Sequence, residues 1–569
     1  MKILKVDRTA SGGIASGRAF VLEEQDLSPD LFAIAPEQAE TEVQRYTAAV
    51  DAVSADLAPL AEKEEIFAAH LELVQDEALR MGVCEKIETG NVNAEKALHD
   101  TAEEYAAVFE MMEDEYMRER AADLKDIRNR LMRKLKNLPE TDLSDIREKV
   151  ILVAKDLAPS DTAKLDLNFV QGFITEGGGV TSHVAIMAKN LGLPALVGVK
   201  GVLEAADSGD FIILDADEKT VYVNPESEIA EEYVKKQEEQ AKRKEELLKL
   251  RDLKAVTTDG HEVEICANVG NLDDIRNALK FSIDGVGLFR SEFLYMENDH
   301  FPTEEEQFEV YKAAAELLGG RELTIRTLDI GGDKGLSYFE FPKEENPFLG
   351  YRAIRIGLDR TEILKTQLKA LLRAGCYGRI RIMYPMIISV EELRSANSLL
   401  EECKNELRTE GKAFAEKPEV GIMIETPAAV MMAEELGAEA DFFSIGTNDL
   451  TQYFLAVDRG NEKISAMYNP FHPGVLRAIA RTIEAGHAAG IKVGMCGEFA
   501  GNPDAVPILL GLGLDEFSMS AGSTLEVKQK IRQAEYQKSL ALAERILKTK
   551  TVPEVEQRIQ EWHQDNQIL

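Results

Sequence analysis

Residues 419–427, EVGIMIETP, and residues 441–449, DFFSIGTND, decide how the second half of this chain folds. Each begins with a short apolar run bounded by polar residues, which is the pattern of a buried strand. The residues between the two stretches have the spacing of a helix. A strand, a helix and a further strand form the repeating unit of a parallel sheet covered by helices, so these stretches predict an α/β fold.

The same unit recurs through the last ~300 residues, a length that suits one large α/β domain. The other six apolar runs are EVEICANVG (262–270), GVGLFRSEF (285–293), LTIRTLDIGG (323–332), RIRIMYPMI (379–387), KVGMCGEFA (492–500) and DEFSMS (515–520). Eight strands with intervening helices match a (β/α)8 barrel. A doubly wound sheet is the alternative, because alternation alone does not show that the sheet closes.

Charged and polar residues follow the predicted strands at their carboxyl ends, where the active sites of such barrels lie. They are Arg290, Glu292, Arg326, Asp329, Lys334, Glu425, Asn448, Asp449, Cys496 and Glu498, with Arg352 and Arg459 in neighbouring loops. Taken singly, a strand-end arginine is usually a salt-bridge partner, and a carboxylate pair is usually a cap or an ion pair. Their shared place at one face favours a site for an anion, because guanidinium binds phosphate and carboxylate bidentately.

Two carboxylates and a thiol extend this hypothesis. Glu425 and Asp449 follow adjacent predicted strands and could hold Mg²⁺, which takes few protein oxygens and completes its shell from substrate and water. A cysteine such as Cys496 is most often a buried small hydrophobe. A free thiol has a pKa of about 8.5, so it is protonated at neutral pH and can give a proton to a carbon base. Because Mg²⁺ disfavours sulfur ligands, we expect proton transfer rather than metal binding from Cys496.

A histidine in a glycine-rich turn is the second candidate site. In ITEGGGVTSHVAIMAKNLGLPALVG (174–198), three glycines follow an apolar run, and Thr181 and Ser182 can cap a helix starting at about His183. A helix N-terminus suits a phosphoryl group, and neutral imidazole is a competent nucleophile. The alternative is a histidine that only helps to cap the helix.

Composition limits the class of protein. The 569 residues suggest about four domains at ~150 residues each, and 44% hydrophobic with 30% charged residues is ordinary globular composition. A net charge of −36 disfavours nucleic acid and leaves a small anion or a basic protein as partner. No apolar run reaches membrane-spanning length, no signal peptide is evident, and the cysteine spacing suits neither disulfides nor zinc. We therefore expect a cytoplasmic protein without membrane insertion.

The first half of the chain contains three kinds of segment. Extended stretches at the N-terminus and again from about Lys149 enclose an Ala-, Glu- and Leu-rich block with helical spacing, predicted to be a bundle of roughly four helices inserted into an α/β domain. A charged run after Pro225 predicts an exposed helical linker, either a solvated helix or a hinge. The expected division is 1–25 with 142–224 for the α/β domain, 26–141 for the bundle, 225–252 for the linker and 253–569 for the barrel.

Seven motifs in order carry a family resemblance. They are GGGVTSHVAIMAKNLGLPALVG (177–198), DGVGLFRSEFLYM (284–296), RTLDIGGDK (326–334), ENPFLGYRAIR (345–355), MIETPAA (423–429), DFFSIGTNDLTQY (441–453) and GMCGEFAG (494–501). Together they resemble the Enzyme I family of the sugar phosphotransferase system over essentially the whole chain. The resemblance implies a swivelling phosphohistidine α/β domain with an inserted helical bundle, followed by a (β/α)8 barrel that binds phosphoenolpyruvate.

The resemblance also implies a reaction. Phosphoenolpyruvate gives its phosphoryl group to a histidine, pyruvate leaves, and the group then passes to a small histidine-containing phosphocarrier protein, the first step of sugar uptake. By motif, His183 would be phosphorylated at Nε2, Glu425 and Asp449 would bind Mg²⁺, and Cys496 would protonate C3 of the enolate. The residues implied to bind substrate are Arg290, Arg326, Lys334, Arg352, Asn448, Asp449 and Arg459.

The family resemblance assigns partners as well. The bundle would dock the phosphocarrier, and the barrel would form a homodimer. Acidic residues of the bundle would steer a basic partner, although a generic acidic surface is the alternative: Glu62, Glu64, Glu65, Glu72, Asp76, Glu77, Glu113, Asp114 and Glu115. His70 resembles a docking-face residue of the family.

Rival classes have features that this sequence does not share. Dikinase and synthase relatives add a nucleotide-binding domain, for which the chain has neither the length nor a G-x-x-x-x-G-K-[ST] loop. A nitrogen-branch Enzyme I would add an N-terminal sensory domain. His183 separates the chain from pyruvate-kinase-like chemistry, and the intact set of barrel residues argues against a regulatory scaffold without activity.

Overall fold

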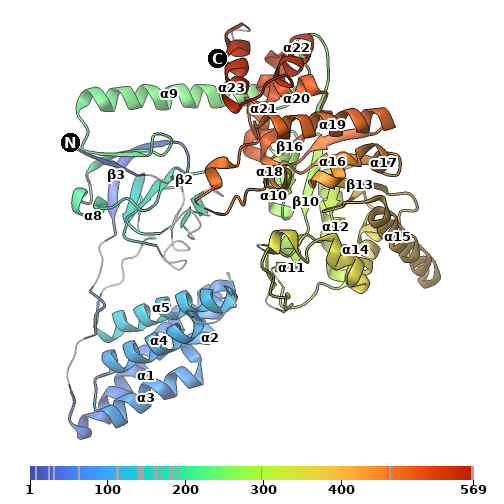
Figure 1. Cartoon of the computed structure of the whole chain (residues 1–569). Helices are drawn as coiled ribbons and strands as arrows, with labels where there is room; N and C mark the ends of the chain where they lie inside the picture. Colours follow the sequence, from blue (N-terminus) through green and yellow to red (C-terminus); the bar gives the residue numbers. More distant parts are fainter. Residues whose placement is uncertain are drawn as a thin grey trace. The chain divides into compact units, whose positions relative to one another are not determined.

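The computed structural model (Figure 1) describes residues 1–565 except for short segments: 7–8, 23–25, 30–32, 62–64, 111–114, 139–142, 144–145, 158–164, 167, 179–183, 186, 189–191, 297, 333, 337 and 462. The chain divides into two compact units, residues 1–242 and 243–569. The boundary falls inside helix α9 (Ser227–Lys249), where the sequence predicts a helical linker. None of the described helices is long and apolar enough to cross a membrane.

The second unit is built on a closed barrel of parallel strands. In chain order the strands are β9 (Glu264–Val269), β10 (Gly285–Arg290), β11 (Glu322–Arg326), β12 (Arg379–Tyr384), β13 (Glu419–Ile424), β14 (Phe442–Ile445), β15 (Lys492–Met495) and β16 (Glu516–Met519). Strand β16 pairs with β9, with Phe517 opposite Ile265, so the sheet closes on itself. The predicted barrel is confirmed, and the doubly wound alternative is wrong.

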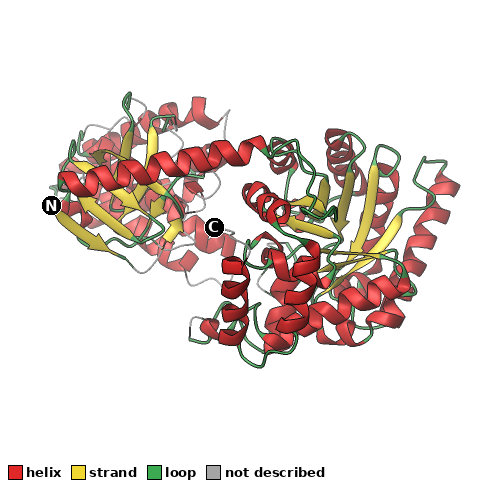
Figure 2. Cartoon of the chain, turned by 90° about the horizontal axis from the view of Figure 1, so that it is seen from above, coloured by secondary structure: helices red, strands yellow, loops and turns green. Residues whose placement is uncertain are grey.

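Helices surround these strands, as Figure 2 shows from a second direction. They are α10 (Leu272–Leu279), α11 (Glu292–Met296), α12 (Glu304–Leu318), α13 (Ile354–Asp359), α14 (Thr361–Ala374), α15 (Val390–Glu410), α16 (Pro427–Met431), α17 (Ala433–Gly437), α18 (Thr447–Leu455), α19 (Pro473–Ala489), α20 (Val506–Leu512), α21 (Thr524–Gln533), α22 (Tyr536–Ile546) and α23 (Val552–Asp565). Because helices cover the outside and side chains fill the inside, a strand such as β13 is buried at every residue after its first.

The first unit contains an eight-stranded mixed sheet in the order β1-β8-β7-β3-β4-β5-β6-β2. Its strands are β1 (Lys2–Lys5), β2 (Thr9–Ser11), β3 (Ile14–Val21), β4 (Val150–Ala154), β5 (Val170–Thr175), β6 (Ala195–Leu196), β7 (Phe211–Asp215) and β8 (Thr220–Val223), with the short helix α8 (Val202–Ala205) before β7. Apolar side chains gather in two separate clusters within this α/β part. Strands from both ends of the segment therefore complete one sheet.

A helical block with a core of its own lies between β3 and β4 in the chain. The described helices are α1 (Ala39–Ala61), α2 (Glu65–Gln75), α3 (Glu77–Gly90), α4 (Ala94–Glu110) and α5 (Glu115–Leu135). The sequence predicted roughly four helices. The apolar spacing runs through Val74 and Leu79, but the Asp76 side chain accepts a hydrogen bond from the Leu79 backbone N and starts a new helix there.

Helix α9 is less exposed than the sequence predicts. Tyr233 is buried, and its hydroxyl donates a 2.8 Å hydrogen bond to Asp215 at the end of β7. Ser16 on β3 donates a hydrogen bond to Gln237, one turn further along the helix. The first half of this charged helix is therefore packed against the sheet of the first unit.

Candidate active site

The carboxyl end of the barrel contains a cavity of about 330 Å³. All twelve charged or polar barrel residues singled out from the sequence line it: Arg290, Glu292, Arg326, Asp329, Lys334, Arg352, Glu425, Asn448, Asp449, Arg459, Cys496 and Glu498. Arg290 and Arg326 are the last residues of β10 and β11, and Cys496 directly follows β15. Since parallel strands of a barrel end at the same face, residues far apart in the sequence meet at this cavity.

Local structure fixes the carboxylates and the amide of the cavity. Thr426 caps helix α16 through Ala429 N, so the chain turns immediately after Glu425 at the end of β13. Asp449 lies in the first turn of α18. The Asn448 side-chain oxygen accepts a hydrogen bond from Glu498 N, which holds this amide against the loop after β15.

Two buried carboxylates hold the cations on one side of the cavity. Glu292 pairs with Arg326 and, at 2.9 Å, with Lys334. Asp329 pairs with Arg326 at 2.7 Å and with Arg352 at 3.0 Å. Burial opposes ionisation of Asp329, but the neighbouring cations, Arg326 foremost, hold the pKa of this carboxyl well below its usual range. These carboxylates stay charged and keep the cations extended into the cavity.

The cations still have donors to spare for an anion. The Nε atoms of Arg326 and Arg352 are buried and have no hydrogen-bond partner among the described residues. Within the described part of the chain, Arg290 forms no ion pair. A glycine lets Arg352 approach: Gly331 has φ of +97°, and a Cβ there would lie 2.6 Å from the Cβ of Arg352. Free, buried guanidinium donors of this kind suit phosphate or carboxylate oxygens.

The opposite side of the cavity has a surplus of negative charge. Glu425 accepts a 2.7 Å hydrogen bond from Met386 N, and Asp449 accepts one of 3.1 Å from Arg352. The other oxygen of Asp449 has no hydrogen bond within the described part of the chain and is buried, and Arg459 lies 3.7 Å from it. Burial and the charge of Asp449 raise the pKa of Glu425 to about 8. A hard divalent cation would relieve this repulsion, so the donor set fits Mg²⁺.

When all of its carboxyl groups are ionised, the charges around the cavity balance. Five cationic side chains line it, namely Arg290, Arg326, Lys334, Arg352 and Arg459, against five carboxylates, Glu292, Asp329, Glu425, Asp449 and Glu498. A bound Mg²⁺ would make the site positive by two charges. The cavity therefore suits a divalent cation together with a small polyanion, rather than either alone. A second cavity of about 670 Å³ adjoins it at Arg290, Phe293 and Glu498.

Cys496 lies at the apolar floor of the cavity. It is buried with Leu288, Met383, Met423 and Phe442, and its backbone N donates a hydrogen bond to Ile445 O. Burial raises the pKa of the thiol to about 11. The thiol is therefore protonated at neutral pH, which suits a proton donor and not a metal ligand.

His183, Thr181 and Ser182 lie outside the described residues, so the predicted phosphorylation site remains a prediction. The described residues on both sides are well anchored. Thr175 ends β5 and donates a hydrogen bond to Gly177 O, and Gly178 has φ of +80°, which favours glycine. Further along, Val184, Ala185 and Ala188 are buried in the core of the α/β part.

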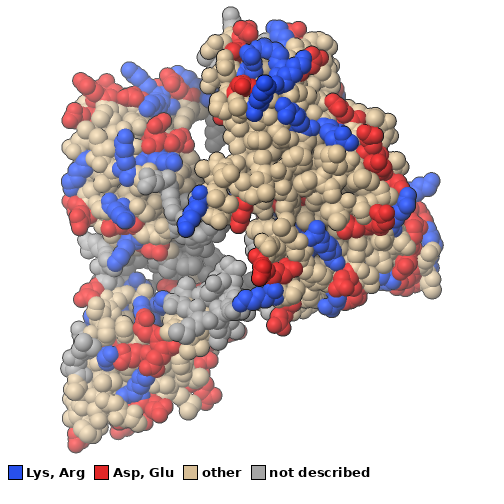
Figure 3. Space-filling view, in the orientation of Figure 1, with Lys and Arg blue, Asp and Glu red and all other residues tan. Residues whose placement is uncertain are grey.

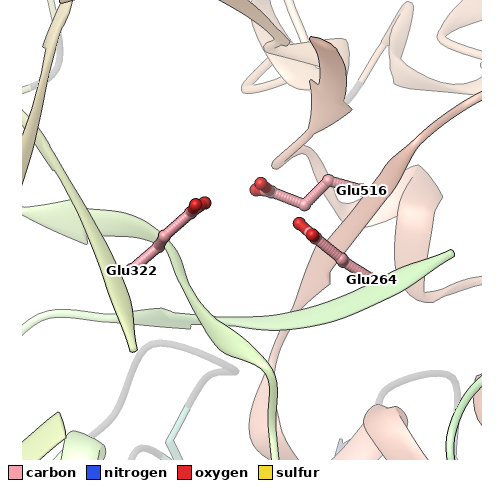
Figure 4. A group of neighbouring side chains, drawn as sticks. All are labelled: Glu264, Glu322 and Glu516. Carbon is pink, nitrogen blue, oxygen red and sulfur yellow. The ribbon is translucent and has the colours of Figure 1, made fainter. Parts of the chain in front are cut away.

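A second group of carboxylates lies at the amino end of the barrel, where Glu264, Glu322 and Glu516 point toward one another (Figure 4). All three begin their strands. Each is matched by a cation: Arg381 lies 2.9 Å from Glu322 and 3.0 Å from Glu516, and Lys492 lies 2.6 Å from Glu264. Because this group is neutralised by side chains, we do not assign a metal to it.

Some predicted features of the bundle differ in the structure. His70 is fully buried, with Nε2 3.2 Å from Asp123 and Nδ1 3.6 Å from Asp126, so it cannot present itself to a partner as a docking-face residue would. Glu72, Asp76 and Glu77 are exposed as expected. Placement of the following side chains lies outside the described residues: Glu62, Glu64, Glu65, Glu113, Asp114 and Glu115.

Sequence reasoning missed a tyrosine that holds one of the arginines of the cavity. The Tyr453 hydroxyl accepts a 3.0 Å hydrogen bond from Arg352 and donates one of 2.5 Å to Phe348 O. The signal was present, because Tyr453 is one helical turn after Asp449 on α18 and so shares its face. It was overlooked because a tyrosine in a helix is ordinary core composition.

Comparison with known families defines the class first. Three descriptions of phosphoenolpyruvate-utilising enzymes match the chain: the PEP-binding domain at residues 244–536, the N-terminal domain at residues 8–120 and the mobile domain at residues 146–219. The chain is therefore built as an enzyme of the phosphoenolpyruvate-utilising class.

Full-length relatives define the family. The chain is 47% identical over 568 residues to the phosphoenolpyruvate-protein phosphotransferase of Haemophilus influenzae, covering 98% of this chain and 99% of the relative. Identity to the enzyme of the same name from Bacillus subtilis is 46% over 555 residues, covering 96% and 97%. An NMR solution structure of Enzyme I (nEIt) is 37% identical over 42% of this chain and 100% of its own, with a TM-score of 0.39. The chain belongs to the phosphoenolpyruvate-protein phosphotransferase family, and the resemblance seen in its motifs is confirmed.

Proposed function

We propose that this chain transfers the phosphoryl group of phosphoenolpyruvate to its own His183 and then to a histidine-containing phosphocarrier protein, releasing pyruvate. The observation that supports this most is the cavity at the carboxyl end of the barrel, which combines free guanidinium donors, a carboxylate pair fit for Mg²⁺ and a protonated thiol. Phosphoryl transfer depends on positioning and charge neutralisation, which this set provides.

The cationic side chains bind and orient the substrate. Arg290 and Arg326 hold the phosphate, assisted by Lys334, Arg352 and Arg459, while Asn448 contacts the remainder of the molecule. Glu292 and Asp329 keep the arginines in place by ion pairs. Because these donors are preorganised in a buried site, they stabilise charge without reorganising during the reaction.

Glu425 and Asp449 hold Mg²⁺, which neutralises substrate charge when bound. The unsatisfied oxygen of Asp449 and the repulsion between the two carboxylates support this assignment. Residues of the chain carry out the proton step. Loss of the phosphoryl group leaves an enolate, and Cys496 donates its proton to C3 to give pyruvate. Burial keeps the thiol protonated until the enolate forms.

The four-part division of the chain follows from this reaction. Residues 1–25 with 142–224 carry His183, residues 26–141 dock the phosphocarrier, residues 225–252 link the units, and residues 253–569 bind phosphoenolpyruvate. Exposed acidic residues such as Glu72 and Glu77 support docking of a basic carrier. On the face seen in Figure 3, acidic and basic side chains are interspersed, so recognition there needs local complementarity rather than net charge alone.

We further propose a homodimer formed through the barrel domain. Its support is a set of large apolar side chains exposed at the ends of short helices of this unit, including Leu349 at 63%, Met431 at 60% and Met467 at 64%. Exposed apolar side chains of this size are typical of association surfaces when they lie together. Location in the cytoplasm remains a prediction from the sequence.

The test is incubation of the pure chain with ³²P-phosphoenolpyruvate and Mg²⁺ in the absence of nucleotide. We expect acid-labile, alkali-stable label that disappears in His183→Ala, while this variant still binds phosphoenolpyruvate. Adding a phosphocarrier protein should remove the label from the wild-type chain. Absence of label without nucleotide, or persistence of label in His183→Ala, would refute the proposal.

A further inference from the structure

Ser444 lies under the floor of the cavity, in the middle of β14. Its register partners are Met423 on β13 and Gly494 on β15, and Met423 faces the cavity. Cys496 is two residues after Gly494, so Ser444 and Cys496 are on the same face of neighbouring strands. Phe442, two residues before Ser444, belongs to the same interior cluster as Cys496. The hydroxyl of Ser444 therefore faces the barrel interior beside the thiol.

This hydroxyl is poorly satisfied. Ser444 is 3% exposed, and no nitrogen or oxygen atom in the described part of the chain is a hydrogen-bond partner of its Oγ. A buried hydroxyl without a partner is costly, and a serine among apolar side chains could be replaced by alanine at no loss of packing. The neutral thiol of Cys496 does not explain why a serine occupies this position, because a thiol is only a weak hydrogen-bond acceptor.

The reaction creates a strong acceptor at the same place. When Cys496 gives up its proton, the sulfur becomes a thiolate against Leu288 and Met423, which cannot solvate it. The sulfur lies 3.9 Å from Ile445 O, which is an acceptor and cannot stabilise negative charge. The charged side chains that act on the sulfur are Arg326 and Arg290, which favour the thiolate, and Glu425, which opposes it.

We propose that Ser444 is a positioning residue for the proton donor: its hydroxyl donates a hydrogen bond to the thiolate that Cys496 becomes. In that step the S–H bond breaks and a C3–H bond forms from the electron pair of the enolate. The negative charge passes from the enolate to the sulfur, and solvent later returns a proton to the thiolate. The inference rests on the proposed function, because it requires Cys496 to be the proton donor.

The hydrogen bond from Ser444 should be stronger after proton transfer than before it. Before the reaction the hydroxyl has only a neutral thiol beside it, and after proton transfer it has a charged acceptor. An interaction that strengthens as charge develops lowers the barrier, whereas one of constant strength does not. Burial raises the pKa of Cys496 to about 11, and among the neighbours that oppose this rise Ser444 has the largest effect.

The test is exchange of the pyruvate methyl protons for deuterium, followed by NMR on the full, unphosphorylated chain with Mg²⁺ in D2O. The reverse proton transfer drives this exchange, so neither phosphoenolpyruvate nor His183 is consumed. Ser444→Ala should lower kcat for exchange by roughly tenfold to a hundredfold, with KM for pyruvate unchanged, because a hydrogen bond to a charged group is worth about one to two powers of ten. Ser444→Thr, which keeps the hydroxyl, should recover most of the rate.

Two control variants distinguish the role of Ser444 from the assignment of Cys496 as the proton donor. Ser539→Ala removes another buried serine hydroxyl, on α22, that has no partner in the described structure, and should leave exchange unchanged. Cys496→Ala should abolish exchange. If Cys496→Ala still exchanges, the assignment of the proton donor is wrong and the proposed function must change. If Cys496→Ala is inactive while Ser444→Ala exchanges normally, or loses kcat and pyruvate affinity together, only the role of Ser444 is overturned.

Discussion

The two ends of the barrel carry the same kinds of side chain and use them differently. At the amino end, Arg381 lies between Glu322 and Glu516, both within 3.0 Å. At the carboxyl end, Arg290 forms no ion pair with any described residue, and one oxygen of Asp449 is buried without a hydrogen bond. Charged residues at strand ends therefore do not define a site by themselves. Unsatisfied donors and acceptors, brought together in a cavity, distinguish a binding site from a structural ion-pair cluster.

The largest effect on stability should come from the amino end. Arg381→Met leaves Glu322 and Glu516 inside the barrel without their shared cation, so we expect a loss of roughly 3 kcal/mol in the free energy of unfolding. Phosphoryl transfer by the folded fraction should be unchanged. Urea unfolding followed by circular dichroism measures the first quantity, and the labelling rate measures the second. A large loss of activity without loss of stability would show that the two ends are not separate in function.

This variant should also be sensitive to pH. Burial raises the pKa of Glu516 despite Arg381, and removing the arginine raises it further. A carboxyl whose pKa is higher in the folded state holds its proton more tightly there, so stability falls as pH rises from its unfolded pKa toward its folded pKa. The difference between Arg381→Met and the wild-type chain should therefore be larger at about pH 8 than at about pH 5.5. An equal difference at both values would argue that Glu516 does not carry the penalty.

The largest effect on activity should come from the carboxyl end. Arg326→Lys keeps the positive charge between Glu292 and Asp329 but loses the planar fork that binds phosphate bidentately. We expect kcat/KM for phosphoenolpyruvate to fall by about 10²–10³-fold, the range for loss of one preorganised donor. Arg379→Lys, at an exposed pair of the amino end, is the matched control and should be neutral. Equal effects of the two substitutions would contradict the contrast between the ends.

The carboxylates at the two ends of the barrel should differ in metal binding. Glu425→Gln removes one of the uncompensated carboxylates, and we expect affinity for Mn²⁺, used as a spectroscopic substitute for Mg²⁺, to fall by roughly tenfold or more. Glu516→Gln, in the neutralised group at the other end, should leave Mn²⁺ affinity unchanged. Electron paramagnetic resonance titration of free Mn²⁺ measures both. Loss of binding in Glu516→Gln alone would move the metal site to the amino end.

The sequence predicts the barrel and the residues around its cavity well because both depend on periodicity. Each strand is a short apolar run, and Arg290, Arg326 and Cys496 are placed by their position at strand ends alone. The twelve predicted residues then meet because parallel strands end at one face. Their presence in one cavity does not establish the role of each residue, so those roles stay predictions.

Features that depend on pairwise contacts were harder to predict. Asp76 begins a new helix where the apolar spacing continues, because a cap overrides periodicity. The burial of His70 depends on Asp123 and Asp126, which lie on another helix of the bundle. The negative charge of the glutamates at the amino end is compensated by Arg381 and Lys492, which lie on other strands. The partners of His70 and of these glutamates are far away in the sequence, so spacing carries no signal of them.

The smallest expected effect tests the contact with Arg352 that helical spacing could have revealed. In Tyr453→Phe, Arg352 loses a hydrogen bond at 3.0 Å, and Phe348 O loses its donor. Two ion pairs, to Asp329 and Asp449, still hold Arg352, so we expect KM for phosphoenolpyruvate to rise about fivefold, with little change in kcat. Tyr338→Phe, which loses a 2.7 Å hydrogen bond to Tyr295 O away from the cavity, is the matched control. If KM rises equally in both variants, the effect is a general loosening of the loops. If it rises only in Tyr453→Phe, the carboxyl end positions its arginines with uncharged partners as well, which the amino end does for Arg381 through Thr324.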